Sequence, residues 1–240
     1  MKKTTLRFNI NTLSGYDFYP FLDVANLIDY SLELRNQTSS SKLKTSINYN
    51  IILQCCTFLE GSLGQIFDSI IEFRKNNILN SNDKYKEYTI QTLNDLEKRI
   101  DKAQWMNYPD IYNSLFGHKL SSKINNESWK AFQIMFKLRN AITHGNVITI
   151  EYTPIDQSNN CKIEVLKKYS DIYDYFSEKK LIETNTYGFV HLMNDKVANY
   201  FAEKIPGFIQ EIVNSITDKS EQSIIMNRLM YLNEKKQDKI

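Results

Sequence analysis

Cysteine, glycine and proline are scarce in this chain, and it has no long apolar run. Its 240 residues include only 3 Cys, 7 Gly and 4 Pro. No stretch approaches the roughly 18 apolar residues of a membrane-spanning helix, and the start, Met1-Lys2-Lys3, does not lead into an apolar signal segment. The three cysteines lack metal-ligand spacing, and the adjacent Cys55 and Cys56 cannot easily bridge to each other. We therefore expect reduced thiols in a cytoplasmic protein, with no membrane contact, no metal and no cofactor.

Neither sign of charge dominates the composition. The chain has 30 Lys and Arg against 28 Asp and Glu, for a net charge of +2. The whole molecule is therefore not a polycation, and any contact with nucleic acid must be local. A Gly-rich phosphate loop and a nucleophile elbow are also missing from the sequence, which argues against P-loop enzymes and α/β-hydrolases.

The chain does have strong helical periodicity. From Ile52 to Phe73, apolar residues recur at steps of 4, 3, 4, 3, 4 and 3, which predicts a packed helix over about residues 45–75. Further helices are predicted over residues 18–36, 83–104, 111–116, 126–145, 170–180, 194–217 and 219–236. Pro206 is predicted to begin the second half of the 194–217 segment as a first-turn proline.

One region has a period of two instead. Apolar and polar residues alternate on both sides of a polar loop within residues 146–168, which predicts a β-hairpin. We therefore expect an all-α fold: one helical bundle over residues 1–240, with a small β-hairpin insertion at 146–168. Its core is expected over about 45–75, 126–145 and 194–217.

The segment from Leu138 to Gly145, Leu-Arg-Asn-Ala-Ile-Thr-His-Gly, is the most informative part of the sequence. Its glycine can end the helix and leave His144 near solvent. Metal-free cleavage of a phosphodiester needs a fixed cation for the developing charge and a group that titrates near neutrality. Arg139 and His144 are these two candidate catalytic groups. Asn140, four residues before His144, can orient the imidazole.

Other residues would support this site. Lys130 and Lys137 lie along the same polar stripe and are candidate RNA contacts. Glu60 is a candidate partner that orients Arg139. Structural alternatives stay open: Arg139 and Glu60 as an ion pair between helices, His144 as a simple helix cap, and the lysines as a solvated face. On an ideal helix Arg139 and His144 are about 140° apart, so either the helix unwinds over 143–145 or two copies of the chain complete the site.

Leu-Arg-Asn, three residues and then His-Gly, at the end of a buried helix, resembles the signature of HEPN-domain proteins. The resemblance covers about half of the chain and implies a helical bundle. Many members of that family are metal-independent endoribonucleases of toxin–antitoxin, phage-defence and RNA-processing systems, and they are commonly homodimers with a composite cleft. By this resemblance Arg139 would stabilise the phosphorane, His144 would be the general acid or base, and Asn140 would orient them.

The resemblance also implies the products and the partners. The 2′-OH of the RNA would be the nucleophile, leaving a 2′,3′-cyclic phosphate and a 5′-hydroxyl. The expected partners are RNA, a second copy of the chain, and an antitoxin or defence-system protein. A subgroup of the family has a tyrosine two residues after the histidine, where this chain has Asn146, so regulation by modification of that tyrosine is not expected. The alternative function is a catalytically inactive, HEPN-like module for dimerisation or partner binding.

Overall fold

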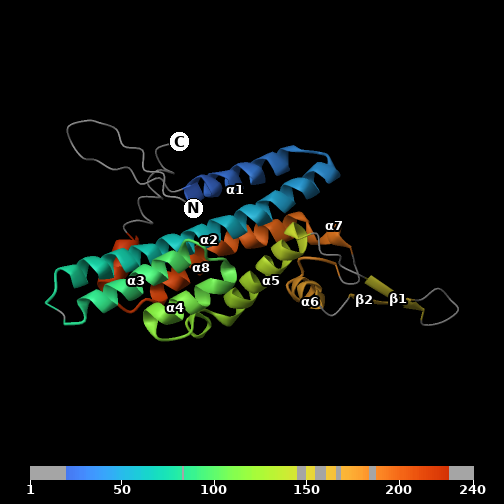
Figure 1. The fold of residues 1–240 in the computed structure, drawn as a ribbon. Helices are drawn as coiled ribbons and strands as arrows, with labels where there is room; N and C mark the ends of the chain where they lie inside the picture. Colours follow the sequence, from blue (N-terminus) through green and yellow to red (C-terminus); the bar gives the residue numbers. More distant parts are fainter. Residues whose placement is uncertain are drawn as a thin grey trace. The chain divides into compact units, whose positions relative to one another are not determined.

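The structure, a computed structural model, describes residues 20–82, 84–144, 150–154, 161–165, 169–183 and 188–226. These residues are mostly helical (Figure 1), so the predicted all-α class is confirmed. The helices are α1 (Pro20–Gln37), α2 (Ser41–Leu79), α3 (Lys86–Ile100), α4 (Tyr108–Phe116), α5 (Asn126–Thr143), α6 (Ser170–Glu178), α7 (Phe189–Leu192) and α8 (Asp195–Ser215), with short 3-10 turns at Trp105–Asn107 and Leu120–Ser122. None of the described helices is both long and apolar enough to cross a membrane.

The periodic segment forms α2, which is longer at both ends than predicted. Every apolar residue of its predicted seam up to Ile70 is buried, and Phe73 is half-buried. Cys55 and Cys56 are also buried inside this helix. Burial raises the pKa of the Cys55 thiol to about 12, so this side chain packs as a small hydrophobe and is not a nucleophile.

The chain divides into two compact units, and α2 and α8 each contribute to both. Among the described residues, unit 1 contains 20–24, 60–123 without residue 83, and 212–226; unit 2 contains 25–59 and the described parts of 124–211. The expected single domain over 1–240 therefore stays a prediction.

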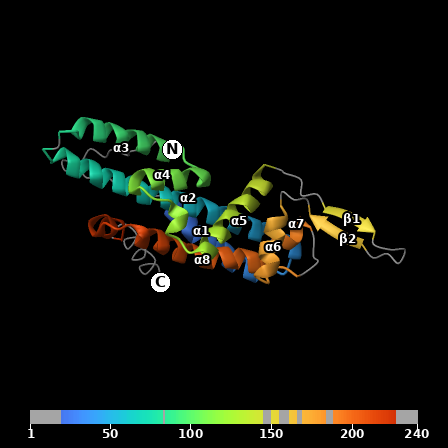
Figure 2. The same ribbon diagram turned by 90° about the horizontal axis from the view of Figure 1, so that it is seen from below.

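Unit 1 is built on the second half of α2, with α3 beside it (Figure 2). Lys75 on α2 pairs with Glu97 on α3 at 2.8 Å. Arg74 joins two further segments, because its Nε lies 2.6 Å from Glu221 and its Nη1 donates to the Leu115 carbonyl at 2.7 Å. These contacts tie α2 to α4 and to the helical residues 219–226.

Unit 2 places α1 alongside the first half of α2 (Figure 1) and packs α5 and α6 against α8. Phe132 of α5 meets Phe208 of α8 with ring centroids 4.2 Å apart. Phe176 of α6 meets Phe201 of α8 at 6.0 Å. All four rings are buried, so apolar packing around α8 positions the helix that carries the predicted motif.

The prediction for Pro206 was wrong. Helix α8 runs without a break from Asp195 to Ser215, and Pro206 lies inside it. A proline in a helix interior costs roughly 3 kcal/mol. Ile205, Phe208 and Ile212 are buried on both sides of it, and burial of these side chains offsets that cost.

Two strands follow α5 in the chain. Strands β1 (Ile150–Pro154) and β2 (Cys161–Val165) pair antiparallel, with Ile150 opposite Val165. Residues 145–149, 155–160 and 166–168 lie outside the described residues. The hairpin insertion over 146–168 therefore stays a prediction, of which the structure describes the two paired strands.

Candidate functional site

Helix α5 carries the predicted catalytic residues on its last turns. Arg139 and Asn140 are half-buried, and His144 is exposed as the residue that caps the helix. The Arg139 guanidinium carbon lies 5.2 Å from the centroid of the Phe136 ring, which is cation–π distance. The three residues thus lie at one helix end, within unit 2 and partly open to solvent.

The helical part of α5 continues through Thr143, whose hydroxyl donates to the Arg139 carbonyl at 3.0 Å. Unwinding therefore does not begin before His144. At helical spacing, Arg139 and His144 leave the axis in directions about 140° apart. Gly145 and Asn146 lie outside the described residues. Unwinding at His144 and Gly145 and completion of the site by a second copy of the chain therefore both stay predictions.

Asn140 contacts His144 through its backbone. The His144 N–H donates to the Asn140 carbonyl at 3.2 Å. Among the described residues, the Asn140 side-chain amide forms no hydrogen bond with the imidazole, so its predicted role in orienting His144 stays a prediction.

Glu60 has a clear structural contact. Its carboxylate accepts a hydrogen bond from the backbone N–H of Trp105 at 2.8 Å, and its carbonyl accepts one from the Tyr108 hydroxyl at 2.9 Å. Both contacts lie in unit 1, whereas Arg139 belongs to unit 2. The ion pair expected between Glu60 and Arg139 stays a prediction.

The two lysines predicted to contact RNA each meet a carboxylate of α6. Lys137 Nζ lies 2.6 Å from both carboxylate oxygens of Asp171. Lys130 Nζ lies 3.4 Å from Glu178 and 5.4 Å from the centroid of the Tyr175 ring. An RNA phosphate would therefore have to compete with these carboxylates, and the RNA contacts stay predictions.

A third carboxylate continues this row of ion pairs. Glu127 of α5 lies 3.3 Å from Lys179, the residue that follows α6, and 3.5 Å from Lys204 of α8. The hydrogen bond and charge of Lys179, followed by the charge of Lys204, hold the pKa of Glu127 below its ordinary value. The outer face of α5 is thus tied by charge to both of its neighbours.

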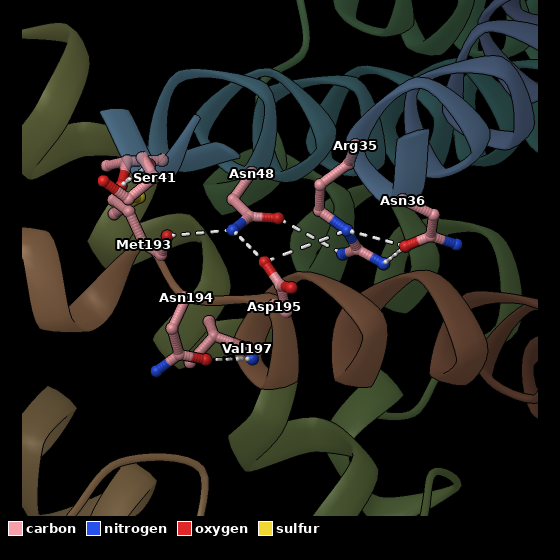
Figure 3. Close-up of polar contacts among 9 residues, drawn as sticks. Arg35, Asn36, Ser41, Asn48, Met193, Asn194, Asp195 and Val197 are labelled. Carbon is pink, nitrogen blue, oxygen red and sulfur yellow. Dashed lines mark hydrogen bonds and ion pairs between the residues drawn. The ribbon is translucent and has the colours of Figure 1, made fainter. Parts of the chain in front are cut away.

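A polar cluster that the sequence did not predict lies in the same unit and consists of Arg35, Asn48 and Asp195 (Figure 3). We name it the junction cluster. The Asp195 side chain is 48% exposed. Arg35 and Asn48 are 3% and 1% exposed. Arg35 Nη1 donates to the Asn48 side-chain oxygen at 3.2 Å, and the Asn48 amide donates to Asp195 at 2.8 Å and to the Met193 carbonyl at 3.1 Å. Arg35 Nε lies 3.8 Å from the same Asp195 oxygen. The cluster joins α1, α2 and α8.

A signal for Arg35 was present in the sequence. Arg35 is two helical turns after the buried Ile28 and therefore on the same face of α1. A guanidinium at an apolar position needs a polar partner, the same reasoning that singled out Arg139.

A cavity of about 580 Å³ lies beside the junction cluster, and we name it the junction pocket. Leu181, Ile182 and Met193 contribute buried apolar side chains to its lining. Its polar lining includes Ser41, Lys44, Thr45, Glu183, His191 and Lys196, together with Asn48 and Asp195 of the cluster. Asn194 also lines it and caps α8, because its side-chain oxygen accepts the Val197 N–H at 2.9 Å.

Comparisons with known proteins found no relative: no protein-family model, no curated protein and no solved structure matches this chain. Among the described residues, no group of three or more His, Cys, Asp and Glu side chains is arranged to hold a metal ion. The argument for function therefore rests on residues and geometry.

Proposed function

We propose that this protein is a HEPN-type endoribonuclease of a toxin–antitoxin or phage-defence system, acting in the cytoplasm without a metal. The observation that carries the proposal is the end of α5, where an accessible imidazole at His144 follows the guanidinium of Arg139 within two helical turns. An arginine can stabilise the phosphorane, and a histidine can act as a general acid or a general base.

In the proposed reaction the 2′-oxygen of the RNA forms a bond to phosphorus while the bond from phosphorus to the 5′-oxygen breaks. One His144 takes the proton of the 2′-OH, and a second His144 gives a proton to the leaving 5′-oxygen. Because one straight helix does not aim Arg139 and His144 at the same atom, a twofold dimer supplies both groups. The products are a 2′,3′-cyclic phosphate and a 5′-hydroxyl.

Cleavage of a single-stranded RNA by the purified chain in EDTA tests the proposal. We expect products that carry 2′,3′-cyclic phosphate ends. Loss of the acid–base group in His144→Ala should lower the rate by about 10²- to 10⁴-fold, and Arg139→Lys should also lose most of the activity, since a lysine lacks the planar fork. Gln133→Ala, an exposed residue of α5, is the matched control and should retain wild-type activity.

Mixing inactive variants tests the dimeric arrangement. In a mixture of Arg139→Ala and His144→Ala chains, heterodimers bring one intact arginine and one intact histidine into a shared cleft. With the single His144 as the base and water protonating the leaving 5′-oxygen, part of the activity should return. Activity that resists both substitutions, or that requires a divalent metal, would contradict the proposed mechanism.

A partner-binding module is the second candidate, and α1 supplies the observation that favours it. Leu27, Tyr30 and Leu34 are 48%, 61% and 41% exposed, and their spacing puts them on one stripe of the helix. Such a stripe matches the way helices dock on partner proteins. Two results together would favour this candidate. The purified chain would not cleave RNA, and its mass in light scattering would fall from that of a dimer to that of a monomer when Leu27→Glu and Leu34→Glu are introduced.

A further inference from the structure

The lining of the junction pocket contains two lysines that have no carboxylate partner among the described residues. Lys44 comes from α2 and Lys196 from α8. Within the part of the chain that the structure describes, neither forms an ion pair, in contrast to Lys130, Lys137, Lys179 and Lys204. Lys44 is half-buried and Lys196 is exposed, so both ammonium groups can reach a ligand in the pocket. Such cations in a pocket favour an anionic ligand.

One of the two carboxylates in the lining, Asp195, already has polar partners. Asp195 accepts the Asn48 amide at 2.8 Å and lies 3.8 Å from the Arg35 guanidinium, whose side chain is 4% exposed. Arg35 therefore offsets part of the charge of Asp195, whose side chain is 48% exposed. Glu183, the other carboxylate in the lining, is exposed, and its charge is screened by solvent.

The remaining polar groups also suit an anion. Ser41 and Thr45 supply hydroxyls, and His191 supplies an imidazole. The polar lining belongs largely to the first turns of α2 and α8, where the helix dipoles add positive potential to that of the lysines.

The apolar part of the lining narrows the class of ligand. Leu181, Ile182 and Met193 provide surface for a ring or a chain that a free phosphate ion lacks. A volume of about 580 Å³ is in the range of pockets that hold small organic molecules. We propose that the junction pocket binds a nucleotide, with Lys44 and Lys196 on the phosphate and the apolar residues against the base or ribose. The nucleotide is either free or part of an RNA strand, and the proposal does not depend on ribonuclease activity.

Calorimetric titration of the full chain with AMP, with adenosine and with a short 2′-O-methyl RNA tests this site. The methylated RNA has no 2′-OH and is not cleaved by the proposed reaction, so binding is measured apart from any ribonuclease activity. We expect AMP or the RNA to bind, and adenosine to bind at least about tenfold more weakly. Binding of AMP indicates a free nucleotide, and binding of the RNA alone indicates a strand.

Paired variants then locate the site. Lys44→Ala/Lys196→Ala should weaken binding at least about tenfold, whereas Lys98→Ala/Lys102→Ala, at two exposed positions of unit 1, should leave it within about twofold. Thermal unfolding of both double variants shows whether they fold. Three results would each overturn the proposal: no binding of AMP or RNA, measurable binding of AMP and adenosine with equal affinity, or equal affinity of the folded Lys44→Ala/Lys196→Ala variant and wild type.

Discussion

Lysines lie on two surfaces of unit 2, and the two sets differ in what they already bind. On the face of α5, Lys130 and Lys137 each meet a carboxylate of α6. In the junction pocket, Lys44 and Lys196 form no ion pair among the described residues. The sequence predicted RNA contacts for the lysines of α5 because they lie on the same stripe as the Arg139–His144 motif. The two lysines of the junction pocket, which have no carboxylate partner among the described residues, lie on other helices.

This difference shows that a count of cations in a sequence does not measure their availability to a phosphate. Lys137 and Asp171 are 34 residues apart, and Lys130 and Glu178 are 48 residues apart. No local pattern joins such pairs. If RNA binds along α5, it must displace these carboxylates, whereas a ligand in the junction pocket meets Lys44 and Lys196 directly.

The largest effect on stability is expected from the junction cluster. Arg35→Ala leaves the buried Asn48 amide and the Asp195 carboxylate without their guanidinium, and we expect a loss of about 2–3 kcal/mol in the free energy of unfolding. Glu33→Ala, an exposed position on the same helix, should change it by no more than about 0.5 kcal/mol. Urea unfolding measures both. Equal midpoints for the two variants would mean that the junction cluster does not hold α1, α2 and α8 together.

A smaller effect is expected on the face of α5. The Lys137 and Asp171 side chains are 36% and 49% exposed, so a double-mutant cycle with Lys137→Ala and Asp171→Ala should give a coupling energy of no more than about 1 kcal/mol. The coupling energy should decrease in 1 M salt, because the Debye length there is only about 3 Å and the two charges are screened from each other.

The substitution Asp171→Asn tests whether the ion pair with Lys137 limits the affinity for RNA. It releases Lys137, so RNA affinity should rise if Lys137 contacts the strand. An unchanged affinity, measured by fluorescence anisotropy with methylated RNA, would remove Lys137 from the RNA-binding surface.

The smallest effect is a dependence of stability on acid pH. The pKa of Glu127 is lowered by Lys179 and then by Lys204, so the folded state binds a proton at Glu127 less readily than the unfolded state does. The stabilisation is therefore present above the ordinary pKa of a glutamate and is lost as the pH falls through the lowered value. Melting temperatures of wild type and Glu127→Gln should differ at pH 7 and converge in strong acid. A difference that persists at low pH would show that Glu127 acts through packing and not through its charge.

The sequence predicted the helices well where their apolar pattern is long. The seam from Ile52 to Ile70 is buried in α2 as expected, and α5 begins at Asn126 as predicted. Both follow from the 3.6-residue period, which depends on neighbours along the chain. The prediction failed at Pro206. Proline favours the first turn of a helix, and this preference does not show how much apolar surface α8 buries on both sides of Pro206.

The candidate site was predicted only in part. Arg139, Asn140 and His144 share a helix end because they are close in the sequence. The junction cluster was not predicted because Asn48 and Asp195 are 147 residues apart in the sequence. The position of Arg35 on the buried face of α1 did indicate that its guanidinium needs a polar partner. The carboxylates that meet Lys130 and Lys137 left no comparable sign.

Residue order alone is enough to establish the helical character of this chain and the spacing of Arg139 and His144 along α5, because hydrogen bonds and side-chain contacts within a helix link residues three or four positions apart. Which lysines are neutralised, where Arg35 is buried and how α8 passes through Pro206 depend on contacts between distant helices. Those contacts form when apolar faces pack together and bring charges from separate segments within a few ångströms of each other, and they become visible only in the folded chain.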